Sequence, residues 1–308
     1  MEKGKRKYME NPSAAGQNSG WFDKARSAEI VNCRMGTETP ARLREIVSAF
    51  VHHLHAAVVE TNLTEAEWME GIRFLTSVGH TCTDWRQEFI LLSDVLGISM
   101  LVDAVSHDRP EGATENTVLG PFYVRSAPAY ANGSRICLDG KGEPLLVRGQ
   151  VRNEAGEPLP GVTVEVWQTN DEGFYDVQQK GIQPEHNLRG VFTTDEEGHY
   201  AFVSVKPRHY PIPDDGPVGQ LLTALGRHPN RPAHIHFMVT KPDYDPVTTH
   251  IFAPDCPYLG SDPVFGVKST LIADFRRCED PNLVKTYGLD SPFWLVEWDF
   301  VLVRKSQG

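Results

Sequence analysis

The spacing of hydrophobic residues divides the chain into a helical part and a strand-rich part. From Thr39 to Val59, apolar residues recur three and four positions apart, which places them on one face of a helix. Thr39 can cap this helix, and Pro40 suits its first turn because the N–H group that proline lacks would be unpaired there anyway. We therefore predict a long amphipathic helix over 40–59.

Two more helices are predicted before residue 108. Thr64 and Glu67 have the spacing of a capping box, in which each side chain binds the other residue's backbone N–H group. The helix that follows carries four apolar residues that are predicted to point inward: Trp68, Met69, Ile72 and Leu75. A third helix is expected from about Asp84 to Leu101, with Gly97 as its weak point because glycine disfavours helix interiors.

The pattern changes after Asp108. Proline and glycine recur every few residues, and apolar residues alternate with other residues in four segments: 162–167, 200–204, 233–239 and 294–302. This two-residue period is typical of β-strands, and no helical crossovers of the kind that a parallel sheet needs lie between the segments. We therefore predict a mainly β fold with an α-helical N-terminal part, the β domain being an antiparallel sandwich or barrel.

Three parts of the chain follow from these patterns. Residues 1–20 hold a basic cluster followed by polar residues with little apolar content, which predicts a flexible tail. Residues 21–108 are predicted to form a helical domain, and residues 109–308 a β-sandwich domain.

The charge balance excludes some classes of function. The chain has 30 lysine and arginine residues against 41 aspartate and glutamate residues, a net charge of −11, which argues against a general nucleic-acid binder. No run approaches the ~18 apolar residues of a membrane span, and the first residues lack the apolar core of a secretory signal. We therefore expect a soluble, cytoplasmic protein with no nucleic-acid or membrane partner.

Histidine rather than cysteine is the promising metal ligand in this chain. The five cysteines are scattered and form no C-x-x-C pair, so neither a disulfide framework nor a thiolate metal site is expected. In the segment 231–237 the strand period places His234 and His236 on one face and apolar residues on the other. Two imidazoles about 7 Å apart at their backbones can converge on one metal ion. Two ordinary histidines remain the alternative at this point.

Two tyrosines lie upstream in loop-like settings rich in glycine and proline. Tyr175 follows Gly173, and Tyr210 precedes the segment 211–213. A single tyrosine is usually part of a core or a surface, so neither stands out alone. A zinc hydrolase built on the histidine pair is disfavoured, because it would leave both tyrosines without a role.

Taken together, these segments resemble the intradiol ring-cleaving catechol dioxygenases, which are non-haem iron(III) enzymes. The resemblance covers roughly residues 77–275 and rests on many blocks in the family's order, which is far more specific than one motif. The blocks are LGPFY at 119–123, PLPG at 158–161, VWQ at 166–168, GFY at 173–175, TTD at 193–195, PDDGP at 213–217, GRH at 226–228 and HIH at 234–236.

The resemblance implies that Tyr175, Tyr210, His234 and His236 hold Fe(III). A phenolate is a hard, anionic donor that favours iron(III), and the cation drives off the phenol's proton despite an ordinary pKa of about 10. The resemblance also implies that Tyr210 leaves the metal during the reaction and that Arg231 stabilises negative charge on the substrate ring. The implied reaction is cleavage of a small aromatic diol by O2, between the two carbons that bear the hydroxyl groups.

Within the family, the segments 173–178, 210–219 and 262–268 are most similar to the branch that acts on hydroxyquinol (benzene-1,2,4-triol). The implied product is 3-hydroxy-cis,cis-muconate or maleylacetate, in the catabolism of aromatic compounds. Asp94 can accept a hydrogen bond from the third hydroxyl group, with a plain helix-surface charge as the alternative. The predicted substrate-binding residues are Leu91, Asp94, Val118, Leu119, Gly120, Pro121, Phe122, Ile212, Pro213 and Val264.

Two other functions stay open. A catechol or chlorocatechol 1,2-dioxygenase that gives muconate or chloromuconate shares part of the pattern. A metal-free β-sandwich binding module would share the fold without the site, because fold alone does not determine function.

The other features have no predicted part in the chemistry. His209, His228 and His250 are interpreted as structural residues or as support for the site. The helical group His52, His53 and His55 is interpreted as a solvated or dimer-facing patch. The resemblance implies a homodimer joined through the N-terminal helices, which hold a lipid in some members, so that 21–108 would be a linker and dimerisation domain.

Overall fold

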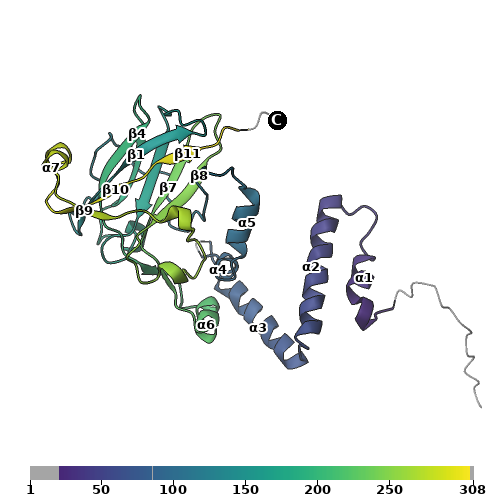
Figure 1. Ribbon diagram of the computed structural model, residues 1–308. Coiled ribbons are helices and arrows are strands. Elements are labelled where there is room, and N and C mark those ends of the chain that lie inside the picture. Colours follow the sequence, from purple (N-terminus) through teal and green to yellow (C-terminus); the bar gives the residue numbers. More distant parts are fainter. Residues whose placement is uncertain (1–20, 85, 306–308) are drawn as a thin grey trace, which may run out of the picture. The chain divides into compact units, whose positions relative to one another are not determined.

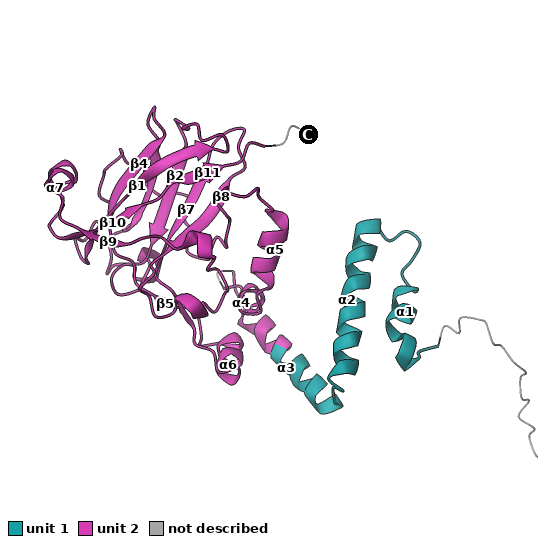
Figure 2. Cartoon of the chain, viewed as in Figure 1, with its two compact units in different colours: residues 1–74 teal, residues 75–308 magenta. Residues whose placement is uncertain are grey.

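The computed structural model describes residues 21–84 and 86–305, so the predicted tail at 1–20 lies outside the described residues. The chain forms two compact units, residues 1–74 and residues 75–308 (Figure 2). All of the named strands belong to the second unit (Figure 1). The helices are α1 (Ser27–Asn32), α2 (Ala41–Glu60), α3 (Glu65–Thr81), α4 (Glu88–Val95), α5 (Ile98–Ser106), α6 (Pro217–Ala224) and α7 (Pro281–Tyr287).

The first two helix predictions are confirmed as α2 and α3. α2 begins at Ala41, directly after Pro40, and has no side-chain cap, so Thr39 does not cap it. The capping box at α3 is present: the Thr64 N–H group donates to a Glu67 carboxylate oxygen at 2.9 Å, and the Glu67 N–H group donates to the Thr64 hydroxyl at 3.3 Å. α1, for which no prediction exists, packs against α2 within the first unit.

Two other details of the helix prediction are wrong. The helix expected from Asp84 to Leu101 is broken into α4 and α5, because Gly97 adopts a left-handed φ of 75° and the two helices are bent by 79°. The apolar residues of α3 do not point inward: Trp68 is 53% exposed, and Met69, Ile72 and Leu75 are exposed as well. All four side chains are therefore more than one third exposed rather than buried in a core.

The strands form two main sheets and a two-stranded one. The strands are β1 (Pro144–Asn153), β2 (Thr163–Gln168), β3 (Arg189–Thr193), β4 (His199–Val205), β5 (Tyr210–Pro211), β6 (Asn230–Arg231), β7 (His234–Thr240), β8 (Val247–Phe252), β9 (Arg276–Cys278), β10 (Phe293–Glu297) and β11 (Phe300–Leu302). One sheet has the order β11-β1-β10-β9, with β4 also paired to β1, and the other has the order β3-β2-β7-β8. β5 pairs with β6.

The predicted sandwich is confirmed, with one difference in strand direction. The two main sheets face each other (Figure 1), and fully buried apolar side chains of both fill the space between them, among them Val147, Phe202, Ile235 and Phe237. Most strand pairs are antiparallel, but β1 runs parallel to both β10 and β11. Alternation alone could not reveal this, because β1 and its parallel partners are separated by most of the domain's sequence.

The described part of the chain has no single helix that is long and apolar enough to cross a membrane. α4 and α5 reach that length and composition only when they are counted together as one bent pair. All five cysteines are free.

Candidate metal centre

The two histidines of the predicted pair lie on β7 and point away from the core between the sheets. Ile235 and Phe237 alternate with them and are fully buried in that core. His234 and His236 are 2% and 1% exposed. The ring of Trp167, on the neighbouring strand β2, stacks on His236 with 4.6 Å between the ring centroids and limits its movement. The strand period thus places both imidazoles in one protected site.

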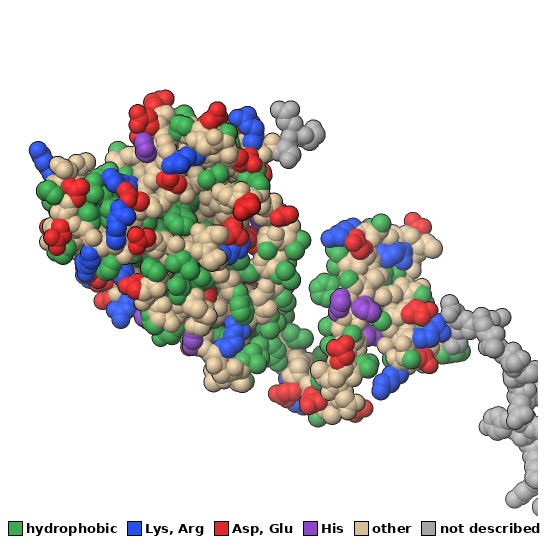
Figure 3. Space-filling view, in the orientation of Figure 1, with side chains coloured by type: hydrophobic (Ala, Val, Ile, Leu, Met, Phe, Trp, Pro, Cys, Tyr) green, Lys and Arg blue, Asp and Glu red, His purple; other side chains and the backbone are tan. Residues whose placement is uncertain are grey.

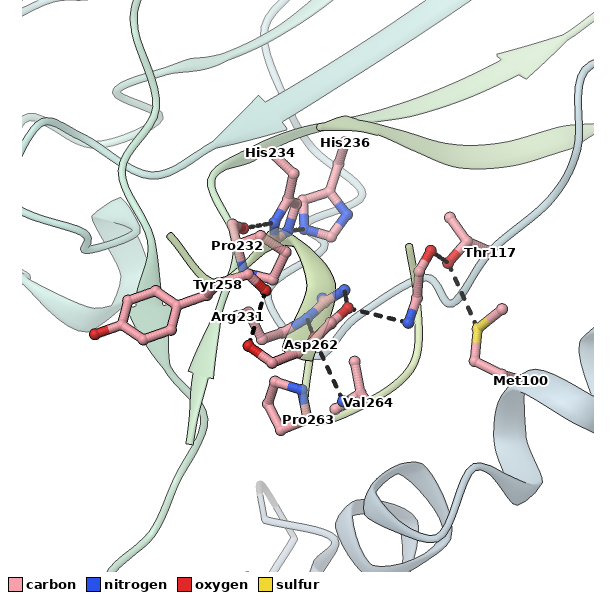
Figure 4. Close-up of polar contacts among 12 residues, drawn as sticks. Met100, Thr117, Arg231, Pro232, His234, His236, Tyr258, Asp262, Pro263 and Val264 are labelled. Carbon is pink, nitrogen blue, oxygen red and sulfur yellow. Dashed lines mark hydrogen bonds and ion pairs between the residues drawn. The ribbon is translucent and has the colours of Figure 1, made fainter. Parts of the chain in front are cut away.

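The donor atoms of this site converge. His234 Nε2 and His236 Nε2 lie 3.1 Å apart, and the Tyr175 hydroxyl oxygen lies 2.9 Å from His236 Nε2. His234 Nδ1 lies 2.7 Å from the Pro232 carbonyl oxygen, which can only accept a hydrogen bond (Figure 4). The His234 proton therefore sits on Nδ1, and the lone pair of Nε2 faces the site.

Both predicted tyrosines are buried beside the histidines. Tyr175 follows β2 after a tight loop, in which Gly173 (φ 89°) lies so close to His209 that a Cβ atom would be 2.7 Å from its carbonyl oxygen. Tyr210 begins β5 and pairs with Arg231 of β6. The rings of Tyr175 and Tyr210 are 5.3 Å apart between their centroids. The two phenols therefore lie together because their two loops approach closely at Gly173, where a larger residue would not fit.

Burial disfavours the charged forms of the two histidines and of Tyr175. Burial lowers the pKa of His234 to about 3, and burial with the neighbouring imidazoles lowers the pKa of His236 well below its ordinary value. Burial, and then the neighbouring Tyr210, raises the pKa of Tyr175 well above its ordinary value. The two imidazoles are therefore neutral near pH 7 and can donate a lone pair, whereas the Tyr175 phenolate needs a cation in the site to form.

This donor set fits a ferric ion. Two imidazole nitrogens that each lie about 2.1 Å from one ion are roughly 3.0–3.4 Å apart, and the observed separation is 3.1 Å. Imidazole suits iron, and two phenolates balance much of the charge of a trivalent cation. The residues present therefore fit the iron that the resemblance implies, with Tyr175, Tyr210, His234 and His236 as the predicted ligands.

Arg231 supplies a positive charge beside these donors. Its side chain is buried, and its Nε and Nη2 atoms donate to the two oxygens of Asp262 at 3.3 and 3.2 Å (Figure 4). Burial acts to lower the pKa of Arg231, but the charges of Asp262 and the tyrosines raise it overall. The guanidinium is therefore charged at all working pH values, and its charge acts to lower the pKa of Tyr175.

Two predicted substrate-binding residues lie directly against side chains that are predicted to be metal ligands. Gly120 adopts a φ of 77°, and a Cβ atom there would lie 3.0 Å from the His236 ring. The Phe122 ring stacks on Tyr175 with 4.5 Å between the centroids. The LGPF segment therefore forms a wall of the site, and Gly120 leaves the room that the imidazole needs.

The other predicted substrate-binding residues lie in the same unit. Asp94 lies on α4. Its carboxyl group hydrogen-bonds to Ser99, and the positive charge of Arg231 acts to lower its pKa. Val264 donates its N–H group to Asp262 Oδ1 at 3.3 Å. The remaining ones are Leu91 on α4, Val118, Leu119 and Pro121 beside Gly120, and Ile212 and Pro213 after Tyr210. Their contact with a substrate stays a prediction.

His250, for which the sequence predicts only a structural or supporting role, lies at the site itself. It is fully buried on β8, directly opposite His236, and the two ring centroids are 4.1 Å apart. One donor atom from each of His234, His236 and His250 lies within 4.8 Å of the others. The alternation of 247–252 could have placed His250 on one face of a strand, but only the register of the hairpin places it beside His236.

His228, by contrast, does not lie among these donors: its Nε2 atom forms a hydrogen bond with the Ser261 hydroxyl on the surface.

A buried ion pair beside Tyr175 was also not predictable from the sequence pattern. Arg189 Nη2 lies 2.6 Å from Asp176 Oδ1, and both side chains are buried. The guanidinium carbon lies 5.9 Å from the centroid of the Tyr175 ring, and its charge acts to lower the pKa of Tyr175. Asp176 directly follows a predicted ligand, which is the one signal that could have drawn attention to it.

Two family models match this chain in succession. The model described as the catechol dioxygenase N terminus matches residues 40–114, and the model described as dioxygenase matches residues 118–304. The second match contains all four predicted ligands and Arg231.

Individual relatives agree with the family models. The chain is 56% identical to a hydroxyquinol 1,2-dioxygenase of Rhizobium sp. (strain MTP-10005), over 93% of this chain and 98% of that protein. The solved structure of hydroxyquinol 1,2-dioxygenase from Pseudomonas putida DLL-E4 is similar with a TM-score of 0.86 and 43% identity, over 92% of this chain and 99% of that one. Catechol 1,2-dioxygenase from Acinetobacter sp. ADP1 is similar with a TM-score of 0.76 and 30% identity, over 91% and 92% of the two chains. This chain therefore belongs to the family of intradiol ring-cleavage dioxygenases.

Proposed function

We infer that this protein cleaves the ring of hydroxyquinol with O2, between the two vicinal carbons that bear hydroxyl groups, to give 3-hydroxy-cis,cis-muconate or maleylacetate. The observation that carries this inference is the convergence of two buried phenols and two buried imidazoles beside a buried arginine. The higher identity to hydroxyquinol enzymes, 56% and 43% against 39% and 30% for two catechol enzymes, favours the triol as substrate.

The proposed cofactor is Fe(III), held by Tyr175, Tyr210, His234 and His236. When bound, the ion would supply Lewis-acid chemistry: the diol would bind it through both oxygens, and electron density would be drawn from the ring. Tyr210 is proposed to take a proton from a substrate hydroxyl group at its phenolic oxygen. Arg231 is proposed to stabilise the negative charge that develops on the ring, a role that a fixed guanidinium performs well in a site without water.

Turnover of three substrates tests this proposal. The iron-loaded protein is expected to consume one O2 per hydroxyquinol and to form the ring-opened product, with kcat/KM at least about tenfold above that for catechol or chlorocatechol. A preference for either catechol would instead support the catechol or chlorocatechol alternative. A protein that binds no iron when iron is supplied and consumes no O2 with any diol would support the metal-free binding module.

Asp94 is proposed to select hydroxyquinol. It lies on α4 near Arg231, and burial raises the pKa of its carboxyl group, an effect that its hydrogen bond with Ser99 and the charge of Arg231 oppose. A partly buried carboxylate in this position can accept a hydrogen bond from a third hydroxyl group. Catechol lacks that group, so its binding would leave the carboxylate without the partner.

Asp94→Ala is expected to lower kcat/KM for hydroxyquinol by about 10- to 100-fold and that for catechol by less than about threefold. The exposed Asp108 offers a control variant, Asp108→Ala, which should change neither value. Equal losses on the two substrates would remove Asp94 from the account of specificity.

We propose that the protein is a homodimer joined through its N-terminal helices. α2 exposes several apolar side chains, including Phe50 at 65% and Leu54 at 61%, and apolar atoms are visible over this helix in Figure 3. A contiguous apolar face on a helix is typical of an interaction surface, and a bound lipid between the two subunits is part of this proposal.

Sedimentation equilibrium should give about twice the chain mass of 34.4 kDa, and Phe50→Glu should shift the measured mass towards that of one chain. A wild-type mass of one chain would contradict the proposal.

The proposed location is the cytoplasm. All five cysteines are free, and they lie far apart in the sequence. Unpaired thiols of this kind are typical of proteins in a reducing compartment.

A further inference from the structure

Arg231 depends on other residues for its orientation. A guanidinium is a planar fork, so it acts on a charge that develops at the substrate only when its plane and its nitrogen atoms are held in place. Within the described residues, Asp262 is the one side chain that hydrogen-bonds to Arg231. The two bonds join Nε to Oδ1 and Nη2 to Oδ2, which is the paired geometry that fixes the plane of a guanidinium.

The Asp262 carboxylate is itself held by its own loop. The N–H groups of Val264 and Gly266 donate to its two oxygens at 3.3 and 3.0 Å (Figure 4). Asp262 is 6% exposed, so these bonds are protected from water. The carboxylate therefore receives four hydrogen bonds, two from Arg231 and two from the backbone, and has little freedom to turn.

The backbone of this loop also packs tightly against the ion pair. A Cβ atom at Gly266 would lie 2.8 Å from Arg231 Nη2 and 3.1 Å from Asp262 Oδ2. The Thr117 hydroxyl, two residues before the LGPF segment, would be 3.3 Å from the same Cβ atom. Even one extra methyl group at Gly266 would therefore have to displace the guanidinium or its partner.

We propose that Asp262 is the positioning residue of Arg231, and that the loop from Asp262 to Gly266 sets the direction in which the guanidinium faces the substrate. This inference rests on the proposed function, because it assigns Arg231 to the diol. Under this proposal, Asp262 positions two parts of the site. It accepts hydrogen bonds from Arg231 and from the backbone N–H group of the predicted substrate-binding residue Val264.

Two variants disturb the pair in different ways. Asp262→Asn keeps the size of the side chain but removes its charge, whereas Gly266→Ala keeps both charges and adds a methyl group beside Nη2. In the full-length, iron-loaded protein, Asp262→Asn is expected to lower kcat for hydroxyquinol by about 30-fold, and Gly266→Ala by about tenfold. KM should stay within about threefold of wild type, and the iron content and visible spectrum should not change.

Matched controls lie in the same part of the chain. Gly260→Ala adds a methyl group where no atom lies within 4 Å, and Asp274→Asn alters a side chain that is 77% exposed. Both are expected to keep wild-type kcat.

A double-mutant cycle separates positioning from a general structural role. If Asp262 acts only through Arg231, then adding Asp262→Asn to Arg231→Met should change kcat by less than about twofold, because the group that it positions is gone. The double variant also leaves no unpaired buried charge, so it should fold. If Asp262→Asn alone does not fold, Gly266→Ala and the double variant still decide the question.

Three results would overturn the inference. They are a kcat within about twofold of wild type for both single variants, a loss of iron that matches the loss of activity, and an undiminished effect of Asp262→Asn in the Arg231→Met background. Wild-type turnover in the same assay separates the two proposals. If wild type cleaves no diol, the proposed function fails together with the role of Arg231, whereas an active wild type with unaffected variants refutes only the positioning role.

Discussion

His236→Ala is expected to yield a folded protein that holds almost no iron and cleaves hydroxyquinol at least about 1,000-fold more slowly than wild type. His236 is the central donor of the site: its Nε2 atom lies 3.1 Å from His234 Nε2 and 2.9 Å from the Tyr175 hydroxyl oxygen. Alanine removes the nitrogen and leaves the strand intact, since the alternating residues of β7 still fill the core. Iron content by elemental analysis and O2 uptake measure the two effects.

A second variant and a control sharpen this test. Tyr175→Phe removes one oxygen atom from a fully packed aromatic cluster, so it should lower iron affinity with little effect on folding. His199→Ala, at an exposed position on β4, should retain both iron and activity. An iron content in His236→Ala equal to that of the iron-loaded wild type would mean that the metal is held elsewhere.

Arg231→Met has the second-largest expected effect: kcat should fall by about 100- to 1,000-fold while bound iron is retained. Arg231 lies opposite Tyr210 in the β5–β6 pair and is buried, so solvent screens its charge only weakly. Its removal should also lower the free energy of unfolding by about 3–5 kcal/mol, because Asp262 is left as an uncompensated buried charge. Steady-state kinetics and urea denaturation measure these effects.

The exposed arginines of the chain provide the comparison for this variant. Arg42→Met removes an ion pair on the surface of α2 with Glu45, and such pairs contribute about 0–1 kcal/mol. It should therefore alter neither kcat nor the free energy of unfolding by a large amount. A kcat for Arg231→Met within threefold of wild type would show that the guanidinium does not act on the reaction.

Local patterns in the sequence predict the parts of the fold and of the site that depend on neighbouring residues. The two-residue period places His234 and His236 on one face of β7, and the spacing of Thr64 and Glu67 predicts their reciprocal hydrogen bonds. The tyrosines could be selected only through the family resemblance, because their proximity depends on the close approach of the loop at Gly173 to a segment more than thirty residues later.

Features that depend on long-range geometry could not be predicted. His250 reaches the site through the register of the β7–β8 hairpin, and Asp262 reaches Arg231 from a loop 31 residues away. Gly97 is the predicted weak point of its helix, but the helical period does not encode the left-handed φ that breaks the helix there. The prediction that the apolar face of α3 points inward is wrong for another reason. A helical pattern shows that a face is apolar, but it does not show what covers that face.

The visible absorption spectrum of the iron-loaded protein, recorded before and after anaerobic addition of hydroxyquinol, tests the central claim most directly. An iron(III)–phenolate centre made by Tyr175 and Tyr210 should give a red-brown protein with a broad charge-transfer band. That band should shift when the triol binds, because the donor set around the ion changes. A protein that stays colourless and binds no iron when iron is supplied, or a band that hydroxyquinol leaves unchanged, would contradict the account.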